Sequence, residues 1–407
     1  MAYREIITRP VIGWGAVAVG ARMPVAMAPL ALVFLVRERP GGYTLGAVLA
    51  AVYVLGEIIG APLLGTRLRP ERARPHLAAG LAVGAAGFLG VGLAHGAHPV
   101  VLGVFAFAAG AGPSAAPGGL RAMLTDLVPE RAAAQAMSLE SVLTFGIWAV
   151  APALTAGLAL GAAPYLPLLL AGLLMAAATA GLWGLPQGWR ADESDRGDDS
   201  MGRILARAWP VYVTGAASLS LLALAELILP ALLEQRDIGI GWSGPLLAGF
   251  SVGSAAGAFV YGLRSWPGRV HVQSLVLMLT VSGCVAVVAV LPWAAAIAAG
   301  LVVAGVVQAG TMLTRNLTLR ATLPPSALAA GYSVMYAAVG AGYAASGTLA
   351  GALLKVVAPS TAILAGVGLT LVLTVVGAVG ERRIVRPAAA APVPGPAVRV
   401  PCEDGAA

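Results

Sequence analysis

Residues 209–233 read WPVYVTGAASLSLLALAELILPALL, and Glu226 is the one charged residue among them. A helix of about 20 mainly apolar residues crosses a bilayer, so this run is long enough to span one. Eleven further runs of the same kind occur in the 407-residue chain. Hydrocarbon offers no partner to a free backbone N–H or C=O, and the runs are continuous rather than alternating. We therefore predict membrane-spanning helices and not a barrel.

The predicted spans form two sets of six. The first set is 11–36, 44–65, 76–96, 99–124, 134–160 and 164–185, and the second is 209–233, 242–263, 270–291, 294–313, 328–354 and 359–380. The one long polar connection inside the chain separates the sets. We expect an all-α integral membrane protein with a bundle over 1–186, a flexible linker over 187–208, a second bundle over 209–381 and a disordered tail over 382–407.

The composition excludes several classes of protein. With 59% hydrophobic and 11% charged residues, the chain cannot cover a water-facing surface of its size. Its net charge of +7 comes from arginines scattered between apolar runs, which is not the footprint of a nucleic-acid-binding protein. The four histidines lie in or near loops without a completing cysteine or carboxylate, and Lys355 lies in no phosphate-binding loop. We expect no enzyme, no catalytic residue, no metal and no cofactor.

The basic residues also predict the orientation. Roughly twenty arginines lie in the loops of one side, and the other side has Arg37, Arg39, Arg236 and Lys355. Short cytoplasmic loops accumulate such residues, so both termini and the linker are expected in the cytoplasm of a multi-pass cell-membrane protein. The first apolar run exceeds the length of a secretory signal, and we expect it to be retained as a span.

The two halves resemble each other at a nearly constant spacing, which favours duplication over a bundle without repeats. Near an offset of 195, Ser138, Trp148 and Pro164 align with Ser333, Tyr343 and Pro359. At an offset of 197, Gly56, Gly60, Gly65, Arg67, Pro70 and Arg72 align with Gly253, Gly257, Gly262, Arg264, Pro267 and Arg269. Chance matches between helices rich in glycine and alanine are the alternative.

Residues 65–74, GTRLRPERAR, follow the second span with a glycine and clustered basic residues. Together with the six-plus-six spans, this loop resembles the major facilitator superfamily (MFS) of transporters. Arg69 occupies the position of the family's aspartate, and the second glycine is missing. The resemblance implies a cytoplasmic gate that contains Gly65, Arg72 and Arg74, with Asp126 pairing with one of the two arginines. The alternative for Asp126 is a solvated charge.

The fifth span resembles the antiporter motif of the drug/proton antiporter (multidrug efflux) branch of that family. Gly146, Ala151-Pro152 and Ala156-Gly157 fit the motif, with alanine in place of the usual glycine before proline. Simple helix packing is the alternative. The buried arginine that those exporters carry in the fourth span corresponds here to Ala106, so coupling through that arginine is excluded.

Ionisable groups inside spans are costly and mark candidate functional positions. Arg22 lies roughly 16 Å into the first span, where it either forms a structural ion pair or holds an anionic substrate group. Glu226, in the repeat-equivalent seventh span, is predicted about one turn from the position equivalent to Arg22. A movable Arg22 would then switch the proton of Glu226 on and off. A permanently paired or permanently neutral Glu226 is the alternative.

Other polar residues in the spans are secondary candidates. Glu57 and Glu140 lie nearer the cytoplasmic half and are further candidates for substrate binding or proton coupling, or for gating; a neutral acid bonded to the backbone is the alternative. Gln308 and Tyr336 are possible substrate contacts. Arg121 and Arg315, at the ends of the fourth and tenth spans, are explained by topology alone.

The function that we predict is proton-coupled efflux of a small hydrophobic or amphipathic compound by alternating access. The expected partners are this substrate, protons and the lipid bilayer, and the resemblance implies a monomer. The alternatives are a uniporter or importer of a small organic solute without proton coupling, and a receptor of the same fold that does not transport.

Overall fold

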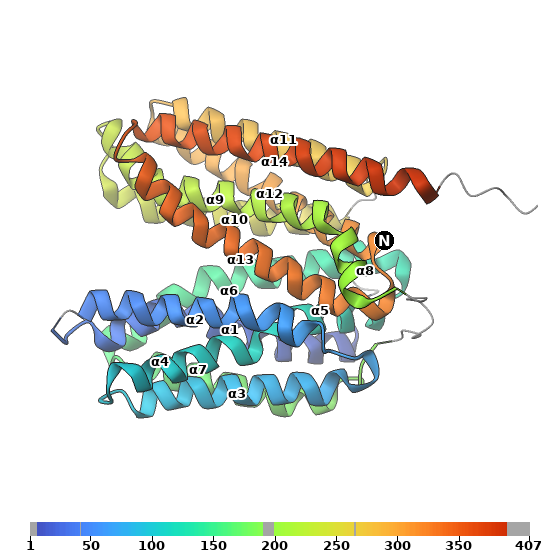
Figure 1. The fold of residues 1–407 in the computed structure, drawn as a ribbon. Coiled ribbons are helices and arrows are strands. Elements are labelled where there is room, and N and C mark those ends of the chain that lie inside the picture. Colours follow the sequence, from blue (N-terminus) through green and yellow to red (C-terminus); the bar gives the residue numbers. More distant parts are fainter. Residues whose placement is uncertain (1–5, 41, 190–198, 264–265, 389–407) are drawn as a thin grey trace, which may run out of the picture.

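The computed structural model describes residues 6–40, 42–189, 199–263 and 266–388, and all regular secondary structure in these ranges is helical (Figure 1). The first half contains α1 (Arg9–Val36), α2 (Gly42–Gly65), α3 (Ala73–Leu93), α4 (Pro99–Ala111), α5 (Ala116–Leu127), α6 (Ala133–Gly161) and α7 (Leu166–Gly181). The second half contains α9 (Trp209–Gln235), α10 (Ser243–Leu263), α11 (Val270–Val290), α12 (Ala294–Thr322), α13 (Leu328–Leu353) and α14 (Pro359–Ala388). The short helix α8 (Met201–Arg207) lies between the halves.

Eleven segments of the described residues are long and apolar enough to cross a membrane. The twelfth predicted span, α13, has 26 residues but is rich in glycine, alanine, serine and tyrosine, which lowers its hydropathy. The fourth span is one segment, Pro99–Leu127, built from α4, the 3-10 turn η3 (Gly112–Ala115) and α5. The predicted twelve-helix fold in two six-helix bundles is therefore confirmed.

The fourth span is interrupted where the sequence prediction drew one continuous helix. Pro113 is the second residue of the turn and Pro117 the second residue of α5, and neither has the N–H that would continue the α-helical hydrogen bonds. The 3-10 turn between α4 and α5 is fully buried. It sets the direction of α5, which carries Arg121.

The linker and the tail depart from the prediction. Residues 201–207 of the predicted flexible linker form α8, and residues 190–198 lie outside the described residues. The tail was predicted from residue 382, but α14 continues to Ala388, because Glu381 is buried in an ion pair with Arg315 that holds this end of the helix in the bundle. Residues 389–407 lie outside the described residues.

The repeat predicted from the sequence reappears as matched helix packing. A Cβ added to Gly56 would meet the carbonyl of Phe107, and one added to Gly60 would meet that of Ala111. At the equivalent positions of the second half, Gly253 meets the carbonyl of Val302 and Gly257 that of Val306. The pairs α2–α4 and α10–α12 thus approach backbone to backbone in the same register, which supports duplication.

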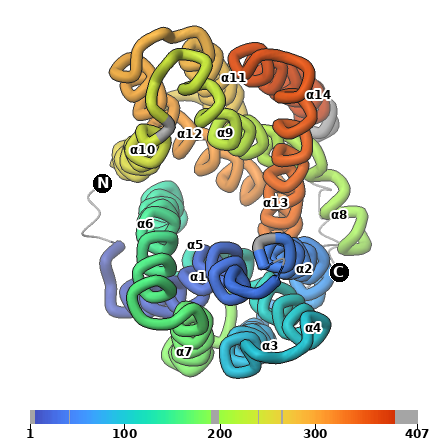
Figure 2. Tube along the Cα trace, turned by 90° about the vertical axis from the view of Figure 1, so that its left-hand side faces the viewer, coloured from blue at the N-terminus to red at the C-terminus, as the bar shows by residue number. Residues whose placement is uncertain are grey.

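The halves are joined mainly at one end of the bundle. We call this the linker end, because the chain passes from α7 to α8 there, and we call the other the far end. Figures 1 and 2 show α13 crossing toward α2 and α6 facing α10. Side-chain hydrogen bonds join the halves in the linker-end portions of their helices. They include Ser138 to Ala258, Trp189 to Pro325, Arg121 to Asn316 and Tyr336 to Glu57.

Along α13, the residues become more exposed from the linker end toward the far end. The residues from Leu328 to Ser333 are buried, whereas most of those from Ala341 to Gly351 are half-buried or exposed. At the linker end, Ser333 lies against both Gly65 and Gly118, where an added Cβ would overlap it. Glycine at these two positions is what permits the close approach of α13 to α2 and α5.

Candidate substrate and coupling site

Two arginines and one glutamate, all from helices of the first half, form a charged cluster. Arg22 Nη2 on α1 and Arg121 Nη2 on α5 each lie 2.6 Å from the same oxygen of Glu140, on α6. The Glu140 side chain is 2% exposed, and those of Arg22 and Arg121 are 10% and 16% exposed. We call these three residues the arginine cluster.

Neutral groups on neighbouring helices orient the cluster. Thr144 Oγ1 accepts a hydrogen bond of 2.7 Å from Arg22, and it donates its own proton to the carbonyl of Glu140. Trp14 Nε1 on α1 donates to the carbonyl of Leu120 at 2.7 Å, which ties α5 to α1 one residue before Arg121. These bonds hold both arginines toward the single carboxylate.

Arg121 also reaches the second half. It donates to Oδ1 of Asn316 on α12 at 3.1 Å, and its guanidinium carbon lies 5.2 Å from the centre of the Tyr332 ring on α13. Such stacking of a guanidinium on an aromatic ring is favourable when it is sheltered from water. The cluster therefore lies at the seam between the halves and not deep inside one of them.

The cluster is unbalanced in charge and in hydrogen bonds. Two guanidinium groups face one carboxylate, which leaves a formal charge of +1 on the three side chains. The Nε atoms of Arg22 and Arg121 are buried and have no hydrogen-bond partner among the described residues. Buried donors without partners carry a free-energy cost, so the site is suited to an acceptor that it does not itself supply.

Glu57 occupies a different environment. One of its oxygens accepts a hydrogen bond of 3.2 Å from Tyr53, on its own helix α2, and one of 3.1 Å from Tyr336, on α13. No arginine or lysine of the described residues lies at ion-pair distance from Glu57. Arg22 interacts electrostatically with Tyr336, so Glu57 and the arginine cluster belong to one region of the interior.

The structure does not bring Arg22 and Glu226 into contact. Arg22 faces α6 and binds Glu140, a buried carboxylate on a helix packed directly against α1. Glu226 is half-buried on α9, and its electrostatic interaction is with Tyr343 on α13. The two residues occupy related places in the repeat, but the rotation of their helices points them to different neighbours.

The prediction that topology alone explains Arg121 and Arg315, as charges at the ends of spans, is wrong. Arg121 belongs to the arginine cluster, and Arg315 is completely buried inside the second half. Arg315 Nη1 donates to Glu381 at 2.5 Å and to Thr214 at 2.7 Å, and its Nε donates to Ser274. These partners come from α14, α9 and α11, so Arg315 connects four helices of one half.

Gln308, predicted as a substrate contact, is 2% exposed and donates to Ser218 Oγ on α9 at 3.0 Å. This contact lies within the second half. Tyr336, the other predicted contact, binds Glu57 across the seam.

Among the predicted gate residues, Gly65 lies against Ser333 of the other half. Arg74 donates to the carbonyl of Leu185 and lies over the ring of Trp183, and Arg72 is exposed.

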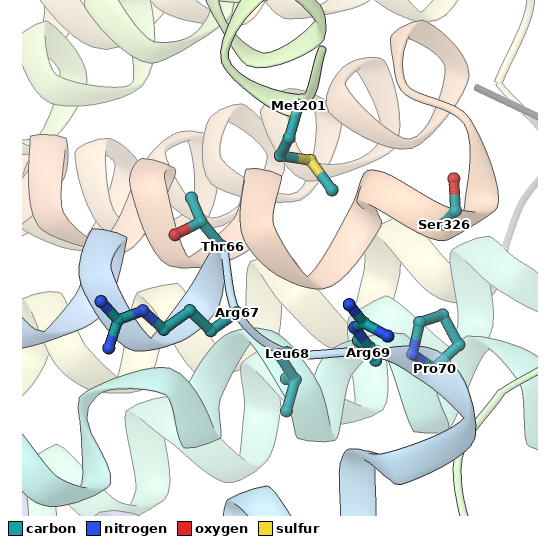
Figure 3. A pocket seen from close by; sticks show the side chains of 7 residues that line it. All are labelled: Thr66, Arg67, Leu68, Arg69, Pro70, Met201 and Ser326. Atoms are coloured by element: carbon teal, nitrogen blue, oxygen red, sulfur yellow. The ribbon is translucent and has the colours of Figure 1, made fainter. Parts of the chain in front are cut away.

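A cavity of about 420 Å³ opens at the linker end, away from the arginine cluster (Figure 3). The loop after α2 supplies most of its lining. Figure 3 shows Arg67 extending away from Arg69, so the polar groups do not converge on one point. It is lined by Thr66, Arg67, Leu68, Arg69, Pro70, Met201 and Ser326.

Sequence reasoning gave no specific site role to Arg121, Thr144, Asn316, Tyr332 or Tyr53, although the last three are among the polar and aromatic residues available within the spans. One signal for two of them was present, because the repeat offset of 195 that aligns Ser138 with Ser333 also aligns Arg121 with Asn316. Equivalent residues near the axis that relates two repeats meet each other. The hydrogen bond between Arg121 and Asn316 is such a contact.

No protein-family model matches this chain, and no curated protein matches it. Solved structures do resemble it. The human organic anion transporter MFSD10 (TETRAN) aligns with a TM-score of 0.70 at 16% identity, over 93% of this chain and 100% of its own. FucP of E. coli, an MFS transporter in the outward conformation, gives 0.68 at 13% identity, over 93% and 99%. A bacterial homologue of the iron transporter ferroportin, outward-facing, gives 0.72 at 13% identity, over 94% and 99%.

These likenesses define the class of structure. The chain is a multi-span membrane protein with the fold of MFS transporters, and the structures that it resembles are transporters rather than enzymes. At identities of 16% or less, the likeness establishes the fold and carries no substrate with it.

Proposed function

We propose that this protein is a secondary active transporter that exports a small amphipathic compound in exchange for protons by alternating access. It acts as a monomer in the cell membrane, with both termini in the cytoplasm. The observation that carries the proposal is the closure of the two halves at the linker end, with polar residues held along the seam. Two bundles that are joined at one end are suited to rocking about a site between them.

The excess of arginine on one side supports the orientation. The linker end then faces the cytoplasm, and the structure is the outward-facing state. MFSD10, FucP and the ferroportin homologue differ in what they carry, so their names do not select a substrate. Export itself is supported by the partial antiporter motif of α6, in which Pro152 interrupts the helical hydrogen bonds.

Glu57 is the proposed proton-binding residue. Its neighbours Tyr53 and Tyr336 are neutral hydroxyls, which can donate to a carboxylate and can either donate to or accept from a carboxylic acid. Glu140, in contrast, faces two cations, and its proton would have to displace ion pairs. Of the two carboxyl groups, Glu57 can therefore gain and lose a proton without breaking a buried ion pair. FucP is a fucose:proton symporter, so the fold supports proton coupling.

Transport in reconstituted vesicles tests the proposal. The probes are 2-naphthalenesulfonate, the neutral 2-naphthalenesulfonamide and trimethyl(2-naphthyl)ammonium. We expect an imposed pH gradient to drive at least one of them across the membrane. In Glu57→Gln, this movement should fall to the rate measured without a gradient, while counterflow of the same probe persists. Glu234→Gln, at an exposed position near the end of α9, is the matched control.

Three outcomes contradict parts of the proposal. Counterflow that never responds to pH indicates a uniporter or importer. If the pH gradient still drives movement in Glu57→Gln, Glu57 is not the residue that couples transport to protons. The absence of both counterflow and driven movement for all probes indicates a protein that binds without transporting.

A further inference from the structure

We propose that the arginine cluster binds the anionic group of the substrate, so that the transported compound is an amphipathic organic anion. This inference rests on the proposed transport function and names its substrate class. It starts from the composition of the cluster, in which Arg22 and Arg121 share one carboxylate. A bound monoanion would neutralise the three side chains.

Hydrogen bonding points to the same ligand. The buried Nε atoms of Arg22 and Arg121 lack partners within the described ranges, although Thr144 and Asn316 satisfy other atoms of the same groups. Guanidinium groups bind carboxylate, sulfonate and phosphate oxygens through paired, charge-assisted hydrogen bonds. An anion placed between the two arginines would supply acceptors for both free donors.

The surroundings of the cluster favour an apolar body attached to this anionic group. One turn along α1 and α6 toward the far end, Ala26, Met27, Ile147 and Ala151 form an apolar group. The partly buried side chains packed against it include Met23, next to Arg22, and Leu143, next to Thr144. A charged point followed by pliable apolar side chains is complementary to an amphipathic molecule.

Access is also consistent with a substrate site. The halves are closed at the linker end, and α13 becomes exposed toward the far end. An anion entering from the far end would meet Arg22 and Arg121 at the edge of the closed portion, where Arg121 contacts Asn316. Because Arg121 contacts Asn316 and Tyr332, a ligand bound there would touch the element that joins the halves.

The test measures equilibrium binding of the same three naphthalene probes to the full-length protein in nanodiscs. The sulfonate should bind more tightly than the sulfonamide, and the trimethylammonium compound should bind most weakly. Arg121→Gln should weaken sulfonate binding by about tenfold or more, the loss expected for one charge-assisted hydrogen bond. Binding of the neutral probe should change little. Arg203→Gln, on the exposed face of α8, is the control.

Glu140→Gln separates a binding role from a structural one. Removing the carboxylate raises the charge of the cluster to +2, so the selectivity for sulfonate over trimethylammonium should increase. A purely structural cluster predicts a lower melting temperature and equal losses for all three probes. Thermal unfolding is measured on each variant, and Glu140→Asp, which keeps the charge, should retain the selectivity of the original chain.

Equal binding of the three probes, no binding of any of them, or selectivity that is unchanged in both Arg121→Gln and Glu140→Gln overturns the assignment. Vesicle transport distinguishes this failure from failure of the proposed function. If the neutral probe is transported and the charged probes show no preference relative to it, the proposed function stands and the anion site is excluded. Charge-selective binding without transport of any probe retains the site and removes the function.

Discussion

The two halves each contain arginine bound to a buried glutamate, but the two groups are constructed differently. In the second half, one arginine faces one glutamate, and Arg315 is 0% exposed inside a single bundle. In the first half, two arginines face one glutamate at the seam between bundles. The neutral, fully buried pair contacts only residues of its own bundle. The three-residue cluster at the seam has a net positive charge and can interact with a ligand and with the other bundle.

A difference of one residue along the chain separates the two arrangements. At the repeat offset of 195, Arg315 aligns with Leu120, while Arg121 aligns with Asn316. Successive residues of an α-helix are rotated by about 100°. The one-residue shift therefore turns an arginine from the interior of a bundle to the seam. Leu120 is buried in the interior of the first half, as this geometry requires.

The largest effect is expected from breaking the buried ion pair between Arg315 and Glu381. Arg315→Ala leaves the carboxylate of Glu381 buried without its cation, which should destabilise the protein by about 3–5 kcal/mol. Replacing both residues with leucine should recover much of this loss, because no charge then remains buried. Thermal unfolding of the solubilised protein measures both. A stable Arg315→Ala protein would show that this pair is not structural, and the contrast with the arginine cluster would fail.

The second prediction tests the seam. Gly118→Ala places a Cβ against the carbonyl of Ala329 and the side chain of Ser333, so the linker end should close less completely. Gly146→Ala is the control, since no atom lies near its added Cβ. Spin labels at positions 131 and 269, both exposed at the linker end, report the separation of the halves after Cys284 and Cys402 are replaced by serine. We expect a longer label distance in Gly118→Ala alone. Identical distances in both variants would show that this contact does not limit closure.

The smallest effect is expected at a solvent-exposed ion pair, which Asp199 forms with Arg203 and Arg207. Asp199 lies just before α8, and its hydrogen bond with Arg203, together with Arg207, lowers the pKa of its carboxyl group. Ionised Asp199 therefore stabilises α8 at neutral pH, and this contribution is lost as pH falls through the lowered pKa. Amide hydrogen exchange of residues 201–207 should show it. Asp199→Asn should lack the pH dependence, and protection in the original chain that does not vary with acid would exclude the effect.

The sequence predicted the spans well where their residues are uniformly apolar. The run 209–233 became α9, Trp209–Gln235, almost unchanged. The run 294–313 became α12, Ala294–Thr322, which continues through Arg315 and Asn316. Hydropathy records the charge of Arg315 but not Glu381, its partner 66 positions along the chain. The predicted span therefore ended too early, and Arg315 was assigned to the helix end.

The same reason limits prediction of the site. Charge inside a span was enough to select Arg22, Glu57 and Glu140 as candidates. Their pairings depend on how α1 and α6 are rotated about their axes, and a composition of alanine, leucine and glycine on every face leaves that rotation undetermined. A helix without a distinct polar face gives no indication of which side turns toward its neighbours. For this reason the sequence did not indicate that Arg22 contacts Glu140 rather than Glu226 in this structure.

The glycine contacts between α2 and α4 have a mechanical consequence. A carbonyl seated where a side chain would otherwise be resists sliding, so the two helices turn as one lever. Glu57 lies on α2, and Arg121 lies on α5, which follows α4 through the short 3-10 turn. If Glu57 binds the coupled proton as proposed, its gain or loss would reach Arg121 as rigid motion of the two helices, without a chain of intervening polar groups.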